Sequence, residues 1–125
     1  MINNDRIVPV KATDLVSLYS AMLFSDLSGS LTKLAASDPG EFTVTSASTA
    51  LIAAEPVKTL DIDATASSVT AATIYFLAAL DYKGFSIDGT AETPAAGSVD
   101  VVPGSGDLYK AVLATGDITI TKVGV

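Results

Sequence analysis

Short runs of β-prone residues, separated by turn residues, follow one another from Leu31 to the end of the chain. Turns are marked by Asp38-Pro39-Gly40, Asp88-Gly89 and Thr115-Gly116, because proline and glycine supply the backbone angles that tight turns need. Asp88-Gly89 is the strongest short-range signal for a hairpin in this chain. Strands that recur at intervals of about 8–12 residues predict a β-sandwich or a small β-barrel.

The segments between these turns have recognisable strand patterns. Residues 42–45, 56–63 and 117–122 alternate with the period of two that a strand requires. Residues 73–80 form a continuous apolar run that favours a buried strand, with a short helix as the alternative. Residues 94–106, rich in Pro, Gly, Ala and Ser, predict a loop in which residues 99–102 pair briefly. Residues 108–114 and 117–122 predict a closing hairpin.

One amphipathic helix is expected, over residues 14–27, with Asp14 near its positive end and Gly29 as its stop. Its apolar stripe consists of Leu15, Leu18, Tyr19, Met22 and Leu23. We therefore expect a mainly β chain of the α+β class: a small antiparallel β-sandwich or barrel with an extended N-terminal arm and one N-terminal helix. The expected parts of this single globular domain are the arm (1–12), the helix packed on the core (13–29) and the β domain (30–125).

The amino-acid composition narrows the classes of function that this chain can have. The chain is 49% hydrophobic and only 17% charged, which excludes a disordered protein and suggests that another chain covers part of its surface. Its net charge is −7, and its seven basic residues are scattered. Such a surface repels phosphate backbones and anionic membranes, so we expect no nucleic-acid and no membrane partner. The longest apolar run is too short to span a bilayer.

The chain has no His, no Cys and no Trp. Histidine is the side chain that titrates near neutral pH, and imidazole and thiolate are the common ligands of transition metals. Their absence predicts a protein that is not an enzyme and holds no metal or cofactor. It also excludes a disulfide, so the packed core must supply the stability.

The remaining candidate residues are few. Asp61 and Asp63 fall on one face of a strand, where two carboxylates could bind Ca²⁺ or act as acid and base. A solvated face beside buried Leu60 and Ile62 is the favoured interpretation. Gly104-Ser105-Gly106 lacks the lysine of a phosphate-binding loop and predicts a flexible loop tip. Most aromatic residues are assigned to the core, and Tyr82 and Tyr109 are the two candidates for ligand contact.

Several short motifs point to a family. The first is residues 4–10, and the others are residues 54–61, 74–76 and 81–85. The first reads Asn4, Asp5, Arg6, Ile7, Val8, Pro9 and Val10. Together the motifs resemble small proteins of tailed bacteriophages and prophages that are encoded beside the major capsid protein, the head decoration or head fibre proteins.

The resemblance implies a structural virion protein that binds the outer surface of an icosahedral head and stabilises it. Its partner would be the major capsid protein, bound through an arm of residues 4–10, and its own assembly a homo-oligomer, with a trimer expected. It would be made in the bacterial cytoplasm and carried on the virion. Two rival hypotheses are a fibre-like or adhesin module that binds bacterial glycans, suggested by residues 94–106, and a hydrolase built on acidic residues alone.

Overall fold

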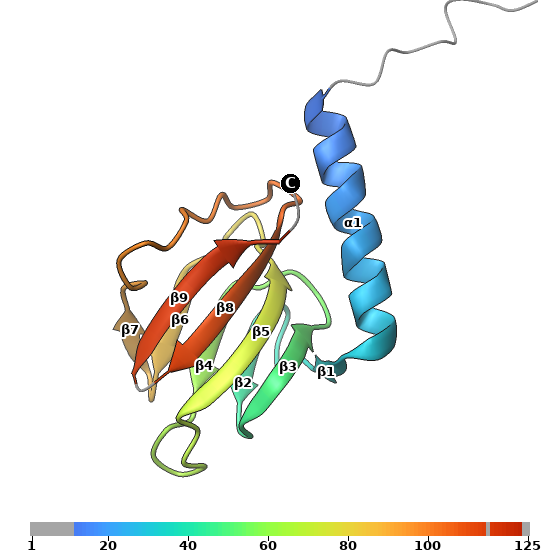
Figure 1. Cartoon of the computed structure of the whole chain (residues 1–125). Helices are drawn as coiled ribbons and strands as arrows, with labels where there is room; N and C mark the ends of the chain where they lie inside the picture. Colours follow the sequence, from blue (N-terminus) through green and yellow to red (C-terminus); the bar gives the residue numbers. More distant parts are fainter. Residues whose placement is uncertain (1–11, 115, 124–125) are drawn as a thin grey trace, which may run out of the picture.

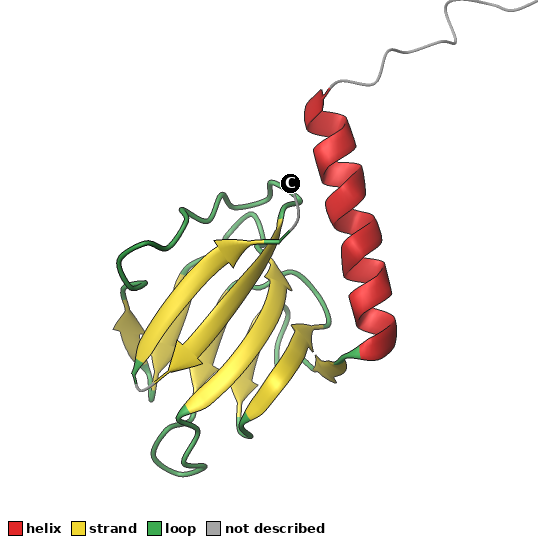
Figure 2. Cartoon of the chain, viewed as in Figure 1, coloured by secondary structure: helices red, strands yellow, loops and turns green. Residues whose placement is uncertain are grey.

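The computed structural model describes residues 12–114 and 116–123, which form one helix and two β-sheets (Figures 1 and 2). The elements are α1 (Ala12–Ser30), β1 (Thr32–Leu34), β2 (Glu41–Val44), β3 (Ser48–Ala53), β4 (Thr59–Ile62), β5 (Ala71–Leu77), β6 (Gly84–Ile87), β7 (Thr90–Glu92), β8 (Leu108–Ala114) and β9 (Asp117–Lys122). The expectation of a mainly β chain with one helix is confirmed for these residues. Residues 1–11, which hold nearly all of the expected arm, lie outside them.

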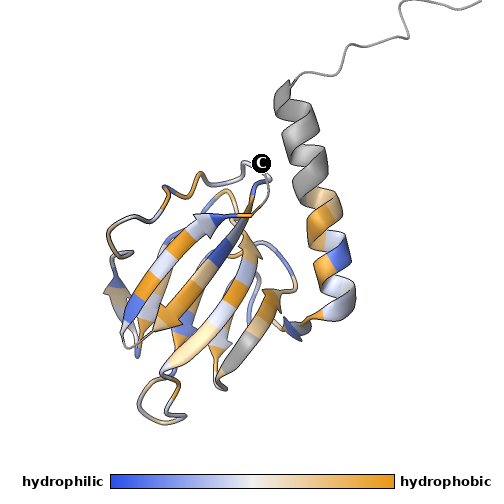
Figure 3. Ribbon diagram, in the orientation of Figure 1, coloured by the Kyte–Doolittle hydropathy of each residue, from blue (hydrophilic) through white to orange (hydrophobic). Residues whose placement is uncertain are grey.

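The strands form a larger sheet of order β1-β3-β5-β8-β9 and a smaller one of order β2-β4-β6-β7. The two sheets lie face to face, one behind the other in Figure 1. They remain separate sheets, so the architecture is a sandwich and the alternative of a barrel is wrong. Along the visible strands of the larger sheet, apolar and more polar residues alternate, as Figure 3 shows by colour.

The expectation of antiparallel sheets is wrong for the first six strands. These strands alternate between the two sheets, and the neighbours β1–β3, β3–β5, β2–β4 and β4–β6 all pair in parallel. The chain therefore winds like a short β-helix, each turn adding one strand to each sheet. Among the described strands, antiparallel pairing joins β5 to β8, β8 to β9 and β6 to β7. Alternation with period two is the same in both kinds of pairing, so it does not reveal strand direction.

Both predicted hairpins are confirmed. Asp88 and Gly89 have φ values of 49° and 81°, the left-handed conformation that a two-residue type I′ turn needs at both positions. This turn joins β6 and β7, with Ile87 paired to Thr90. The second hairpin joins β8 and β9, with Ala114 paired to Asp117. Residues 71–77 form strand β5, so the strand interpretation of the apolar run is also confirmed.

The core fills the space between the sheets and has an aromatic centre. Phe76 is fully buried, and its ring lies 5.4 Å from that of Phe85 and 5.6 Å from that of Tyr109. Phe85 comes from the smaller sheet, whereas Phe76 and Tyr109 come from the larger one. Around this centre are aliphatic residues that are almost completely buried, among them Val44, Leu60, Ile62, Ile74, Ala111 and Ile120. Aromatic pairs of this kind contribute about 0.5–1.5 kcal/mol each beyond their buried area.

Helix α1 lies against the outer face of the larger sheet. It contacts β8, whose inward-facing residues, such as Tyr109, already pack against the other sheet. Leu108 on the same strand and Ile52 on β3 are both 0% exposed, yet neither belongs to the core between the sheets. Because side chains alternate along a strand, both face outward, toward the side on which α1 contacts the sheet.

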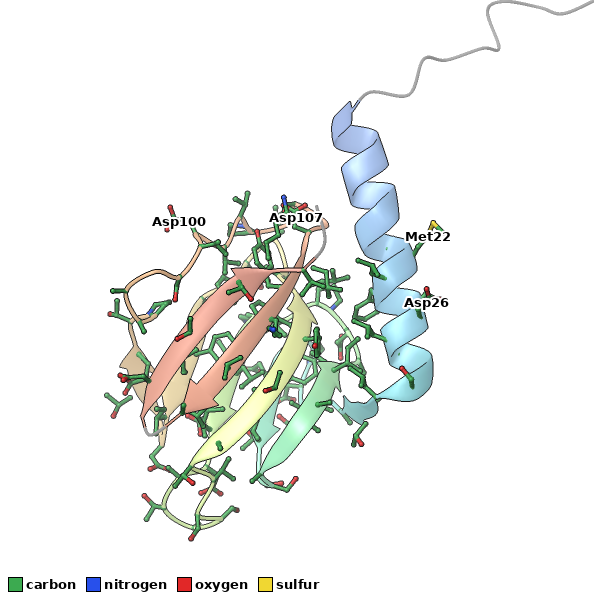
Figure 4. The ribbon with its side chains drawn as sticks, in the orientation of Figure 1. Met22, Asp26, Asp100 and Asp107 are labelled. Atoms are coloured by element: carbon green, nitrogen blue, oxygen red, sulfur yellow. The ribbon has the colours of Figure 1, made fainter. Side chains whose placement is uncertain are left out.

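The side of α1 that faces the sheet is apolar and the other side is exposed. Leu23, Phe24 and Leu27 are half-buried. Met22 is 60% exposed, and its side chain and that of Asp26 point away from the sheets in Figure 4. The helix ends at Ser30, one residue beyond the glycine expected to stop it. Its first turns extend past the edge of the sandwich (Figure 1).

The backbone conformation and the close neighbours of Gly40 leave no room for a side chain at this position. Gly40 has a φ of 74°, and a Cβ there would lie 2.9 Å from Lys58 Cβ and 3.3 Å from the Pro56 carbonyl oxygen. We expect Gly40→Ala to lower the free energy of unfolding by about 3 kcal/mol, because strain from positive φ, about 1–2 kcal/mol, adds to this clash. Urea unfolding followed by circular dichroism measures the change.

Gly89→Ala is the matched control. Gly89 also has a positive φ, 81°, but no atom within 4 Å of the added Cβ. Its substitution should therefore show only the conformational strain, about 1–2 kcal/mol. Equal losses for the two variants would contradict the steric argument.

Candidate functional site

Three aspartates gather at one edge of the smaller sheet. Strands β4 and β6 run in parallel with Ile62 opposite Ile87, so their carboxyl ends meet at the same edge. Asp61 is the last but one residue of β4. Asp63 directly follows the end of β4, and Asp88 directly follows the end of β6. Sequence reasoning found the first two; Asp88 was recognised only as a turn residue.

Each of these carboxylates accepts hydrogen bonds from a neighbouring loop. Asp88 Oδ1 accepts from the amides of Ala64 (3.0 Å) and Thr65 (3.2 Å), and Asp88 Oδ2 accepts from Thr65 Oγ1 (2.7 Å). Asp61 Oδ1 accepts from Ser86 Oγ at 2.6 Å and from the amide of Gly89 at 2.8 Å. Asp88 and Asp61 therefore tie the loop after β4 and the β6–β7 turn to the smaller sheet.

Asp63 folds its own loop. Its Oδ1 accepts from the amides of Ala66 (2.9 Å) and Ser67 (3.1 Å), and its Oδ2 accepts from Ser67 Oγ (3.1 Å). An aspartate that precedes a loop rich in Ser and Thr commonly bonds to the amides that follow it. This signal was present in the sequence, where Asp63 was considered as part of a solvated face.

These contacts define what the cluster can do chemically. Asp63 and Asp88 each accept three hydrogen bonds, which occupy most of the about four lone-pair sites of a carboxylate. In the described part of the chain no three His, Cys, Asp or Glu residues are grouped so that they could hold a metal ion. The arrangement of these aspartates holds the neighbouring loop and turn in place.

A second candidate site is a cleft of about 500 Å³ between the β6–β7 hairpin and residues 93–101. Buried Phe85 and Ile120 form part of its floor, and Tyr82, Lys83 and Glu92 are among the residues of its wall. The cleft lies where the edge strands of the two sheets, β7 and β9, are bridged by the connection from β7 to β8.

Strand β9 holds that connection in place. The amides of Ala95 and Val99 donate to the carbonyls of Ile118 (2.7 Å) and Ile120 (2.9 Å), and Ser98 Oγ accepts from the Ile120 amide (3.0 Å). Within residues 99–102, where brief pairing was expected, Val99 forms such a bond.

The glycines of this connection were expected at a flexible loop tip, but Gly104 packs closely against the sheet. Its amide donates to the Ala78 carbonyl at 3.1 Å. A Cβ at Gly104 would lie 2.8 Å from Leu80 Cδ1.

The structure separates the two tyrosines proposed as ligand contacts. Tyr109 is 2% exposed, and its hydroxyl accepts a hydrogen bond from the Val102 amide at 3.0 Å, so it serves the core. Tyr82 is half-buried and lines the cleft, with its ring stacked 6.0 Å from that of Phe76. Burial, with a smaller contribution from Tyr109, raises the pKa of Tyr82 to about 12. The Tyr82 hydroxyl therefore keeps its proton at neutral pH.

Comparison with family models, with curated proteins and with solved structures gives no match for this chain. Within the described residues, no helix has both the length and the apolar character needed to cross a membrane. The expected capsid-binding residues 4–10 lie outside the described part of the chain. Function is therefore argued from the residues and the geometry.

The Asp88 contacts generate a prediction about pH. The hydroxyl and amide of Thr65, together with the amide of Ala64, lower the pKa of Asp88 below its usual 3.8. A lowered pKa in the folded state means that the stabilisation is complete above the pKa of the unfolded state and is lost as pH falls through the folded value. We expect Asp88→Asn to lower the melting temperature at pH 7, and the difference from wild type to shrink as pH falls below 3.8.

Asparagine suits this test because, like aspartate, it tolerates positive φ. Asp117→Asn, at an exposed position with no hydrogen bond to its carboxylate among the described residues, is the control and should leave the melting temperature unchanged. A difference between Asp88→Asn and wild type that stays constant from pH 7 to pH 2 would contradict this role.

Proposed function

We propose that this chain is a structural protein, not an enzyme, that coats the outer surface of a bacteriophage head. Its partner is the major capsid protein, and residues 4–10 bind it. The motifs that resemble head decoration proteins suggest this role. The observation that carries it is the position of α1, whose first turns extend past the edge of the sandwich (Figure 1).

The sequence before Ala12 suits binding by strand addition. Ile7, Val8 and Val10 are β-prone, and Pro9 lacks the amide that an inner strand would need. An extended segment of this kind can pair with an exposed sheet edge of another protein, where main-chain hydrogen bonds supply affinity and alternate side chains supply specificity.

Charge and chemistry support the same role. A body with a net charge of −7 is repelled by packaged DNA, which favours the outside of a shell over its interior. Asp61, Asp63 and Asp88 each accept a hydrogen bond from a neighbouring hydroxyl group of the chain itself. Many copies on one head, assembled as trimers in this proposal, multiply weak contacts into stable attachment.

Removal of the arm tests the proposal. We expect a chain lacking residues 1–12 to keep its circular dichroism spectrum and its cooperative unfolding, because the buried core that the structure describes is built from residues between Phe42 and Ile120. The same truncated chain should no longer co-sediment with undecorated heads. Wild-type occupancy of the heads by the truncated chain would overturn the proposal.

A single substitution tests whether the arm binds through specific side chains or whether any segment of the same length would do. Val8→Asp places a charge within the apolar segment and should weaken head binding at least tenfold, since a buried unpaired charge is strongly unfavourable. Asn3→Asp adds the same charge before the segment and should bind like wild type. Equal loss in the two variants would indicate charge repulsion without a specific arm contact.

A further inference from the structure

The wall of the cleft between the β6–β7 hairpin and residues 93–101 contains charged groups that have no partner. Lys83, Glu92 and Asp100 line it. Asp100 lies near the middle of the connection from β7 to β8 (Figure 4). None of the three forms an ion pair with any residue that the structure describes. Elsewhere the chain does pair its charges, as in Lys58–Asp81 (3.9 Å) and Lys122–Asp107 (3.6 Å). The cleft therefore offers both donors and acceptors that the fold itself leaves unused.

Tyr82 adds a further unused donor at a fixed position. Its ring is held by stacking on Phe76, and its hydroxyl, which stays protonated at neutral pH, has no hydrogen-bond partner among the described residues. Ser98 Oγ accepts a bond from the Ile120 amide and keeps its own proton available. A half-buried hydroxyl without a partner gains from a ligand that can accept its bond.

The lining of the cleft has accessible apolar residues and groups of both charges. Pro94 and Val99 are exposed there, whereas Phe85 and Ile120 beneath them are almost completely buried. One cationic and two anionic groups stand around this apolar surface. A polyanion is disfavoured by this surplus of carboxylates and by the net charge of −7. The volume of 500 Å³ is within the range of about 300–1,000 Å³ that small ligands and ligand segments fill.

We propose that this cleft binds a neutral saccharide. A pyranose ring has hydroxyl groups that both donate and accept, which matches Glu92 and Asp100 as acceptors and Lys83 and Tyr82 as donors. Its apolar C–H face matches the exposed apolar lining residues Pro94 and Val99. This inference goes beyond attachment to a capsid and does not depend on it. Copies arrayed on one particle would bind a polysaccharide multivalently, so weak affinity at each cleft suffices.

Nuclear magnetic resonance of the full chain tests the proposal directly. Maltohexaose, cellohexaose and N-acetylchitohexaose are titrated separately into ¹⁵N-labelled protein. We expect at least one of them to shift the amide signals of residues 82–85 and 92–101, with a dissociation constant of about 0.1–10 mM, which is ordinary for a single shallow site. The signals of β3 and of the loop after β4 should stay in place.

Variants identify the groups that bind. Tyr82→Phe keeps the stacked ring and removes only the hydroxyl, and Glu92→Gln removes one charged acceptor. Each should raise the dissociation constant about three- to tenfold, the usual effect of one hydrogen bond. Asp117→Asn, outside the cleft, should leave the constant unchanged, and near-native spectra show that each variant is folded.

The opposite outcomes overturn the proposal. These are the absence of any shift with all three hexasaccharides at 10 mM, shifts confined to another surface, or equal affinity for wild type, Tyr82→Phe and Glu92→Gln. Shifts in the cleft caused by a neutral peptide library and by none of the saccharides would assign it to a protein partner instead. Loss of capsid binding in the arm variants has no bearing on this result, so the two proposals fail independently.

Discussion

The fold depends on one constraint: every strand except the short edge strands β1 and β7 buries one face between the two sheets. Because consecutive strands from β1 to β6 alternate between the sheets, each turn of the chain contributes inward residues to both sides of the core. Leu60 and Phe85 come from one side, and Phe76 and Tyr109 from the other, and the aromatic rings meet at 5.4–5.6 Å. With no disulfide possible, this contact between the layers is the main source of stability.

The alternation of strands between the two sheets places loops at the ends of the parallel strands. Aspartate carboxylates hold these loops by hydrogen bonds. A parallel pair cannot be closed by a tight hairpin, so its connections are longer and their amides need partners. Asp63 and Asp88 supply those partners to residues 64–67, which would otherwise leave several amides to water. Asp63, which together with Asp61 first suggested a metal site or an acid–base pair, therefore has a structural explanation in the topology itself.

The sequence predicted the local elements well, because their signals are local. The type I′ turn at Asp88-Gly89, strand β5 and the helix follow from residue types at fixed spacing. Pairing direction did not follow, since period-two alternation is common to parallel and antiparallel strands. The cleft could not be predicted from the sequence either. It brings Tyr82, Glu92 and Ile120 together, and only the strand order places β7 and β9 at the same end of the sandwich. Tyr82 and Tyr109 looked equivalent in sequence, yet alternation along β8 directs Tyr109 into the core.

Helix α1 and the proposed saccharide cleft involve different strands of the sandwich. Helix α1 joins the body through β1, the first strand of the larger sheet, whereas the cleft adjoins β7 and β9, the last strands of the two sheets. The residues proposed for attachment, 4–10, and the residues proposed for saccharide binding, 82–85 and 92–101, do not overlap in the sequence. Each proposal can therefore be tested in a chain that keeps the other region intact.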